Sequence, residues 1–269
     1  MMKLAWLNLH RNPSRALLTI FSVFLAAFFS ILFGSIKNGI LNSSTDSILK
    51  LSGGHIEIRS NSYSKTRSID DIMHFDSSTL DSISMLPYVK SVLPVLQSYL
   101  LISHSSSPST KAVAIIGIDP ESEKDRILTV SEMVEGDWFS KHDKGVILGE
   151  NMREQLGLEI GDTLAVMGMG YHGSSAVGLI PIQGMARIPV ATVDKSTIFI
   201  TLSAAQELFQ AEDCYSEIYI MSERLDKVDL IKSQIQNIFP YDEYEIRDWK
   251  SIIEEYLFYF RFSDAIGFI

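Results

Sequence analysis

The stretch ALLTIFSVFLAAFFSILFGSI, residues 16–36, decides the fold class of this chain. It contains no charged residue between Arg15 and Lys37, and Ser, Thr and Gly are its only weakly polar members. A helix of about 20 mostly apolar residues spans the hydrocarbon core of a bilayer. The stretch therefore predicts a transmembrane helix at 16–36.

The charges beside this helix predict its orientation. Lys3, Arg11 and Arg15 precede it without any acidic residue, and a long polar segment follows it. Because basic residues favour the cytoplasmic side, we expect 1–15 to form a cytoplasmic or interfacial N-terminus and the following segment to be extracytoplasmic. A cleaved signal peptide is the alternative, but its apolar region is usually about 7–15 residues long and ends at a small-residue cleavage site.

Composition narrows the class of the rest of the chain. The 269 residues are 46% hydrophobic, which allows a sizeable core, and the net charge is −10. An acidic protein is a poor partner for nucleic acid, whose phosphates require basic patches. Cys214 is the only cysteine, so an intramolecular disulfide is excluded and a small disulfide-stapled receptor module is disfavoured.

The apolar spacing continues past the predicted membrane helix. Ile36, Ile40, Ile48 and Leu51 recur at helical intervals, and Gly53-Gly54 supplies a stop. A helix from residue 13 to residue 51 would be about 58 Å long, whereas the hydrocarbon core takes about 30 Å. We expect residues 37–52 to form a stalk, with a solvated linker as the alternative.

The polar remainder shows an α+β pattern. We predict β-α-β-β before an insertion and β-α-β after it, which is a split βαβ arrangement. This porter-like subdomain covers 53–119 and 214–248, a β-rich inserted subdomain covers 120–213, and 249–269 forms a second stalk and the start of a second, truncated transmembrane helix. Strands are predicted at 55–59, 89–103, 112–118, 145–150, 164–167, 179–183, 187–192, 197–202, 217–221 and 243–247. Helices are predicted at 76–86, 151–156, 204–209 with Ser203 as the cap, and 225–239, and loops at 61–71 and 105–110.

The sequence contains no pattern typical of an active site. The six histidines lack the spacing of a zinc site. Gly168, Gly170 and Gly173 match the dinucleotide pattern literally, but no helix with a ribose-binding acid follows, so a turn between strands is favoured. We therefore assign no catalytic, cofactor-binding or metal-binding residue and expect no cofactor; no substrate-binding residue is identified.

Several motifs occur in a fixed order along nearly the whole chain. They are Arg11-Asn-Pro-Ser-Arg15, Gly53-Gly-His-Ile-Glu-Ile58, Gly117-Ile-Asp-Pro120, Gly136-Asp-Trp138, Val146-Ile-Leu-Gly-Glu150, the segment 156–164 (LGLEIGDTL) and the segment 202–208 (LSAAQEL). Together they resemble FtsX-like permeases of ABC transporters with a MacB-like periplasmic core domain. The GHIEI and IDP segments are most similar to the lipoprotein-releasing branch.

The resemblance implies a non-catalytic permease subunit in the bacterial inner membrane, multi-pass when full-length, with its main domain in the periplasm. It implies a cytoplasmic ABC ATPase that hydrolyses ATP, a second permease copy or homologous permease forming a dimer, contact with membrane lipid, and a periplasmic lipoprotein carrier or cargo. Its expected role is to transmit ATPase motion to the outer domain for lipoprotein release or substrate export. The further transmembrane helices of such permeases would lie beyond Ile269, so the chain is expected to be a fragment or a truncated product. Two other classes stay open: a membrane-anchored sensor or binding module, and a membrane-anchored hydrolase.

Overall fold

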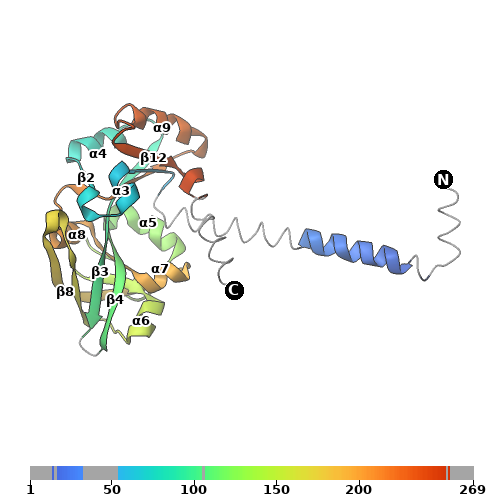
Figure 1. Ribbon diagram of the computed structural model, residues 1–269, viewed down its shortest axis with the longest axis horizontal. Coiled ribbons are helices and arrows are strands. Elements are labelled where there is room, and N and C mark those ends of the chain that lie inside the picture. The colour runs from blue at the N-terminus through green and yellow to red at the C-terminus, as the bar shows by residue number, and fades with distance from the viewer. Residues whose placement is uncertain (1–13, 15–16, 33–53, 105–106, 253, 255–269) are drawn as a thin grey trace. The chain divides into compact units, whose positions relative to one another are not determined.

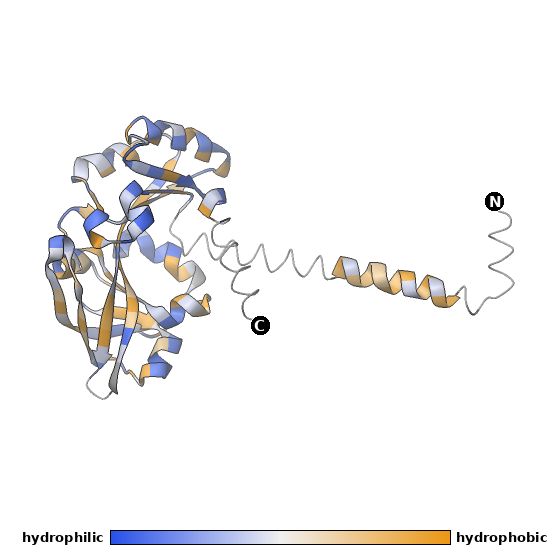
Figure 2. Ribbon diagram, viewed as in Figure 1, coloured by the Kyte–Doolittle hydropathy of each residue, from blue (hydrophilic) through white to orange (hydrophobic). Residues whose placement is uncertain are grey.

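The computed structural model describes residues 14, 17–32, 54–104, 107–252 and 254. The chain divides into two compact units, residues 1–46 and residues 47–269. In the first unit, residues 17–32 form a helix that is dominated by apolar side chains (Figure 2). Leu17 and Ile31 are each 71% exposed. Within the described residues, no helix reaches the length and apolarity needed to cross a bilayer. The predicted crossing segment includes residues 16 and 33–36, which lie outside the described ranges, as do the stalk at 37–52 and residues 255–269.

The second unit combines strands and helices, so the predicted α+β class is confirmed (Figure 1). Its strands are β1 (Ile56–Ser60), β2 (Met73–His74), β3 (Val89–His104), β4 (Ser107–Ile118), β5 (Glu132–Gly136), β6 (Val146–Gly149), β7 (Thr163–Met169), β8 (Ser175–Arg187), β9 (Thr197–Thr201), β10 (Cys214–Tyr215), β11 (Glu217–Ser222) and β12 (Tyr244–Asp248). Its α-helices are α3 (Asn61–Thr66), α4 (Ser77–Ser84), α5 (Pro120–Val130), α6 (Glu150–Leu156), α7 (Ala191–Ser196), α8 (Leu202–Phe209) and α9 (Val228–Gln236). Three 3-10 turns are η1 (Ile69–Asp71), η2 (Tyr171–Gly173) and η3 (Leu225–Lys227).

The split βαβ arrangement is formed by elements from the beginning and the end of the second unit, namely β1, α4, β3, β11, α9 and β12. Strands β12, β1, β11 and β3 are neighbours in that order, and each pair is antiparallel. Helices α4 and α9 supply Ile83, Ile231 and Ile235 to a buried cluster with residues of β1 and β11. Alternation in these strands directs one set of side chains to this cluster and the other set to the opposite face.

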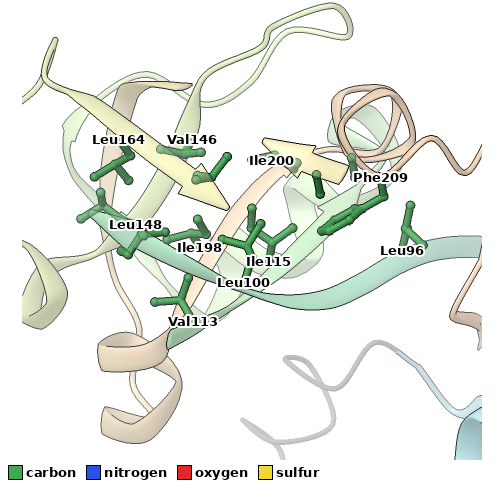
Figure 3. Close-up of a cluster of buried hydrophobic side chains, with 14 of the residues drawn as sticks. Leu96, Leu100, Val113, Ile115, Val146, Leu148, Leu164, Ile198, Ile200 and Phe209 are labelled. Atoms are coloured by element: carbon green, nitrogen blue, oxygen red, sulfur yellow. The ribbon is translucent and has the colours of Figure 1, made fainter. Parts of the chain in front are cut away.

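A closed ring of strands forms the rest of the unit. The pairings run β3–β4, β4–β9, β9–β6, β6–β8, β8–β7 and β7–β3, which returns to the first strand. Its interior is filled by apolar side chains, several of which meet in Figure 3, including Leu100, Ile115, Leu148 and Ile198. Closure leaves no free edge within the ring. Strand β3 pairs with β11 up to Val95 and with β4 from Leu96 onward, so one strand joins the ring to the βαβ part. The division into subdomains at 119/120 and 213/214 stays a prediction.

Some local predictions were wrong. The predicted loop at 61–71 contains α3 and η1, because the Ser60 side chain accepts hydrogen bonds from the backbone of Ser62 and Tyr63 and the Tyr63 side chain is buried. The predicted strand at 187–192 leads into α7, whereas β8 continues unbroken to Arg187. Helix α8 begins at Leu202 with Thr201 as its cap in place of Ser203. The β3–β4 connection is shorter than predicted, since β4 begins at Ser107.

Candidate functional site: a charged junction of the first and last strands

We call the second unit, residues 47–269, the outer unit, and the first and last strands among its described residues lie side by side. β1 and β12 are antiparallel, with Ile56 opposite Asp248 and Ser60 opposite Tyr244. The start of β1 and the end of β12 therefore lie at the same end of the pair, where the Trp249 amide donates to the His55 carbonyl at 2.8 Å. The chain segments that lead toward residues 17–32 and toward residue 269 consequently leave the sheet from adjacent positions.

The same tripeptide occurs in both strands, as Glu57-Ile58-Arg59 in β1 and Glu245-Ile246-Arg247 in β12. In the antiparallel register Ile58 faces Ile246, so each glutamate faces an arginine of the other strand. Arg247 Nη2 donates to Glu57 Oε2 at 2.6 Å, and Arg59 Nε donates to Glu245 Oε2 at 2.8 Å. Within β1, Arg59 Nη1 lies 3.3 Å from Glu57 Oε1. A repeated sequence thus forms two reciprocal cross-strand ion pairs.

Strand β11 and helix α3 extend this cluster. Glu217 of β11 accepts from Arg67 Nη1 at 2.6 Å through Oε1 and from the Tyr219 hydroxyl at 2.6 Å through Oε2. Ser64 of α3 donates its hydroxyl to Glu245 Oε2 at 2.6 Å. We name this cluster the charged junction, and it consists of Glu57, Arg59, Arg67, Glu217, Glu245 and Arg247. Its three carboxylates and three guanidinium groups balance in formal charge.

Burial makes these ion pairs unusual. Glu57 is only 2% exposed and Arg59 only 4%. Burial and the neighbouring Glu217 raise the pKa of Glu57 to about 7, although Arg247 and Arg59 oppose the shift. In β12, burial also acts to raise the pKa of Glu245. Hydrogen bonds from Ser64 and Arg59 outweigh this effect and lower the pKa of that carboxyl below its usual value. The pKa values of Glu57 and Glu245 are therefore shifted in opposite directions within the same junction.

Hydrogen bonds fix the end of the strand pair at which β1 begins and β12 ends. At the start of β1, His55 Nδ1 accepts from the Ser222 amide at 3.0 Å. Burial and the nearby Lys90 lower the pKa of His55, which favours the neutral acceptor form. At the end of β12, Asp248 Oδ1 accepts from the Ser251 amide at 3.0 Å and so caps the helical residues 249–252. Strand β12 thus passes directly into a helix without a linker.

The chemistry of the junction is structural. The arginine, glutamate and tyrosine side chains pair with one another and provide no activated nucleophile, and the described residues contain no group of His, Cys, Asp and Glu placed to hold a metal ion. Breaking a buried ion pair by removing one partner costs about 3–5 kcal/mol. The geometry is therefore suited to keeping β1, β11 and β12 together as one rigid piece.

No residue of this junction was predicted from the sequence, although the EIR tripeptide, which occurs in two predicted strands, was a usable signal. The glycine-rich segment forms the β7–β8 turn with η2. Gly168 lies in β7, where a Cβ atom would come within 2.8 Å of the Leu100 Cβ, so close strand packing explains this glycine. Cys214 is buried, and His104 lies 3.5 Å from Asp162.

Comparisons with known proteins place the chain in a family. A family model for the MacB-like periplasmic core domain matches residues 16–238. The fold is similar to the periplasmic region of MacB from Actinobacillus actinomycetemcomitans, with a TM-score of 0.52 and 12% identity over 74% of this chain and 91% of that chain. It is also similar to the extracellular domain of the noncanonic ABC-type transporter YknZ from Gram-positive bacteria, with a TM-score of 0.50 and 12% identity over 72% of this chain and 99% of that chain. No curated protein matches the chain. The family match covers the apolar helix and the outer unit as far as residue 238, and the chain therefore belongs to the family of MacB-like periplasmic core domains, which are parts of ABC-type transporter permeases.

Proposed function

We propose that this chain is the permease subunit that transmits motion from a cytoplasmic ATPase to an extracytoplasmic domain, for lipoprotein release or substrate export. The observation that carries the proposal is the family match over residues 16–238, which includes the apolar helix and the whole ring of strands. Family members of this type are normally non-catalytic, so ATP hydrolysis belongs to a partner subunit. A second permease copy or a homologous permease completes the transporter.

The charged junction supports the mechanical part of the proposal. A force that separates the chain segments before His55 and after Trp249 acts on adjacent ends of β1 and β12, and such a force opens an antiparallel pair from one end. The first cross-strand ion pair along that path joins Glu57 and Arg247. Because the pair is buried, opening it would expose or strand two charges in a low-dielectric environment. The outer unit would therefore move with the attached segments as one body.

The helical residues that follow β12 support the same role. Asp248 ends β12 and caps the helical residues that follow, and Lys232 of α9 donates to its Oδ2 at 3.0 Å. Burial opposes ionisation, but the hydrogen bonds from Ser251 and Lys232 lower the pKa of Asp248 to about 2, so this cap stays charged at physiological pH. Asp248 caps the helical residues after β12 and also accepts a hydrogen bond from α9. A rotation of those helical residues would therefore be transmitted to the βαβ part of the unit.

The test inserts flexible glycines beside Ser44, in the segment that we propose as the first stalk. Each interior glycine weakens a helix by about 1 kcal/mol relative to alanine. In the complete transporter with its ATPase, the insertion should preserve ATP turnover and abolish cargo release. The same glycines inserted at 105–106, in the β3–β4 connection, form the matched control and should preserve both. If the variant with glycines beside Ser44 releases cargo normally although its helix is shown to be broken there, the proposed transmission of motion is contradicted and a passive binding module is favoured.

A further inference from the structure

An uncharged apolar surface covers the outside of the strand ring on β3, β7 and β8. Alternation directs Leu100, Ile102 and Val166 into the ring, and the residues between them point outward. The outward set is Tyr99, Leu101, Met167, Met169, Val177 and Leu179, and each of these side chains is between 41% and 75% exposed. We name this set the apolar sheet face.

The six residues form one continuous surface. Leu101 is opposite Met167 in the β3–β7 pair, and Met167 is opposite Val177 in the β7–β8 pair. Opposite residues in antiparallel pairs have Cβ atoms about 4.5–5.5 Å apart. The three side chains therefore lie next to one another in a row across the sheet, and Leu179 extends the surface along β8.

Size and composition distinguish this face from ordinary surface. Six large side chains that are about half exposed present on the order of 600 Å², the upper limit of the roughly 300–600 Å² of the largest apolar patch on a typical monomer. Methionine and tyrosine are enriched in interface cores, and charged residues are depleted there. In a protein with net charge −10, a face without any charge allows two acidic copies to approach with less electrostatic repulsion than a charged face would.

The other sides of the ring do not offer such a surface. Helix α5 supplies Ile127 to a buried cluster with Ile118 and Phe199, so the outside of β4 and β9 is already covered. Figure 1 shows α5 and α7 on one side of β3 and β4, with β8 on the other side. A membrane surface is a poor occupant, because the face has no lysine or arginine and anionic lipid repels an acidic protein.

We propose that the apolar sheet face binds the same face of a second copy of this chain. Two faces of this size would together bury on the order of 1,200 Å², which reaches the lower limit of about 1,200–2,000 Å² for a stable interface. In an isologous contact the same patch is used twice. Because β7 is the middle strand, a two-fold axis through the centre of the face places β7 against β7 and Met167 near its own equivalent. The proposal rests on the proposed function for the anchoring of two copies in one membrane.

The test is symmetric cross-linking of the full chain in native membranes. Cys214→Ser supplies a background without thiols, and Met167→Cys is introduced into it. The matched control is Met85→Cys, at a methionine that is 82% exposed beside α4 and outside the face. A short bis-maleimide should join Met167→Cys chains into a dimer at about tenfold higher yield than Met85→Cys chains, and Met167→Glu should lower self-association by about tenfold or more, because an unpaired carboxylate would be buried.

The outcomes separate the surface from the transport role, since cross-linking requires neither ATP nor cargo. Equal dimer yields for the two cysteine variants would overturn the proposal. A Met167→Cys thiol that neither cross-links nor reacts with a monofunctional maleimide would also overturn it, because a different partner then covers the face. If the Met167→Glu variant still forms the oligomer and its cargo release stays coupled to ATP hydrolysis, the proposed function stands and the assigned interface is wrong.

Discussion

Replacing Arg247 with alanine should destabilise the outer unit, and the loss should grow with pH. Arg247 Nη2 donates to Glu57 Oε2 at 2.6 Å, and Glu57 is 2% exposed. Removing one partner of a buried ion pair costs about 3–5 kcal/mol when the other partner stays charged. Glu57 can avoid part of that cost by taking up a proton, because its pKa is already about 7 with Arg247 present and Arg247 is one of the groups that lower it.

The sign of the pH effect follows from the raised pKa of Glu57. A raised carboxyl pKa favours folding below the unfolded-state value, and this contribution is lost as pH rises through the folded-state value. Between pH 6 and pH 8 the wild-type carboxyl changes from mostly protonated to mostly ionised. In the Arg247→Ala variant the Glu57 carboxyl stays protonated to a higher pH. The extra loss of stability in the variant therefore accumulates over about one pH unit, between the wild-type pKa of about 7 and pH 8. One unit corresponds to about 1.4 kcal/mol, and the loss should be larger at pH 8 by about that amount.

Urea unfolding of the chain in detergent micelles, followed by tryptophan fluorescence at pH 6 and pH 8, measures this effect. Arg224→Ala is the matched control, because Arg224 and Asp226 form an exposed pair at 2.9 Å with side chains 61% and 57% exposed. Such pairs contribute about 0–1 kcal/mol. In a Glu57→Gln background the pH dependence of Arg247→Ala should disappear. A loss equal to that of Arg224→Ala, or a loss independent of pH in the native background, would refute the assignment of Glu57 and Arg247 as a buried coupled pair.

Three further predictions concern the helix, the ring and the topology. Leu25→Arg should abolish membrane insertion, because arginine at a helix centre costs about 2.5–3.5 kcal/mol on insertion scales; an unchanged yield in the membrane fraction would exclude a crossing at 16–36. Gly117→Ala should destabilise the outer unit by about 1–3 kcal/mol, since its Cβ would come within 2.3 Å of the Ala205 Cβ under α8; thermal unfolding of the variant at the wild-type temperature would contradict that packing. Met85→Cys in a Cys214→Ser background should react with an impermeant thiol reagent in intact cells, and reaction only after lysis would reverse the predicted orientation.

Local patterns predicted the elements that depend on local sequence. Alternation of apolar and charged residues identified 55–59 and 243–247, which became β1 and β12 within one residue at each end. Capping and apolar spacing identified the region of α4 and α9. The order of these elements was enough to predict the split βαβ arrangement. These features depend on residues close in sequence, so a single sequence contains the required information.

Elements that depend on distant partners were missed. Helix α3 is polar and short, and its position depends on burial of the Tyr63 side chain. Helix α7 contains Asp194, which is buried and accepts hydrogen bonds from the backbone of Asn151 and Ile188. Closure of the ring requires β3 to pair with β7 across a long stretch of sequence. The charged junction was missed for the same reason, because its ion pairs appear only when the two EIR tripeptides are aligned in antiparallel register.

The central claim is that ATP-driven motion reaches the outer unit through β1 and β12. Single-molecule energy transfer between dyes at Ser14→Cys and Met85→Cys, in a Cys214→Ser background, measures it most directly. Ser14 lies in the described part of the first unit and Met85 in the second, and both are exposed. In the complete transporter, addition of ATP should shift the distribution of transfer efficiencies, and the glycine insertion beside Ser44 should remove the shift while ATP turnover continues. A distribution that is identical with and without ATP in the unmodified chain would contradict the account.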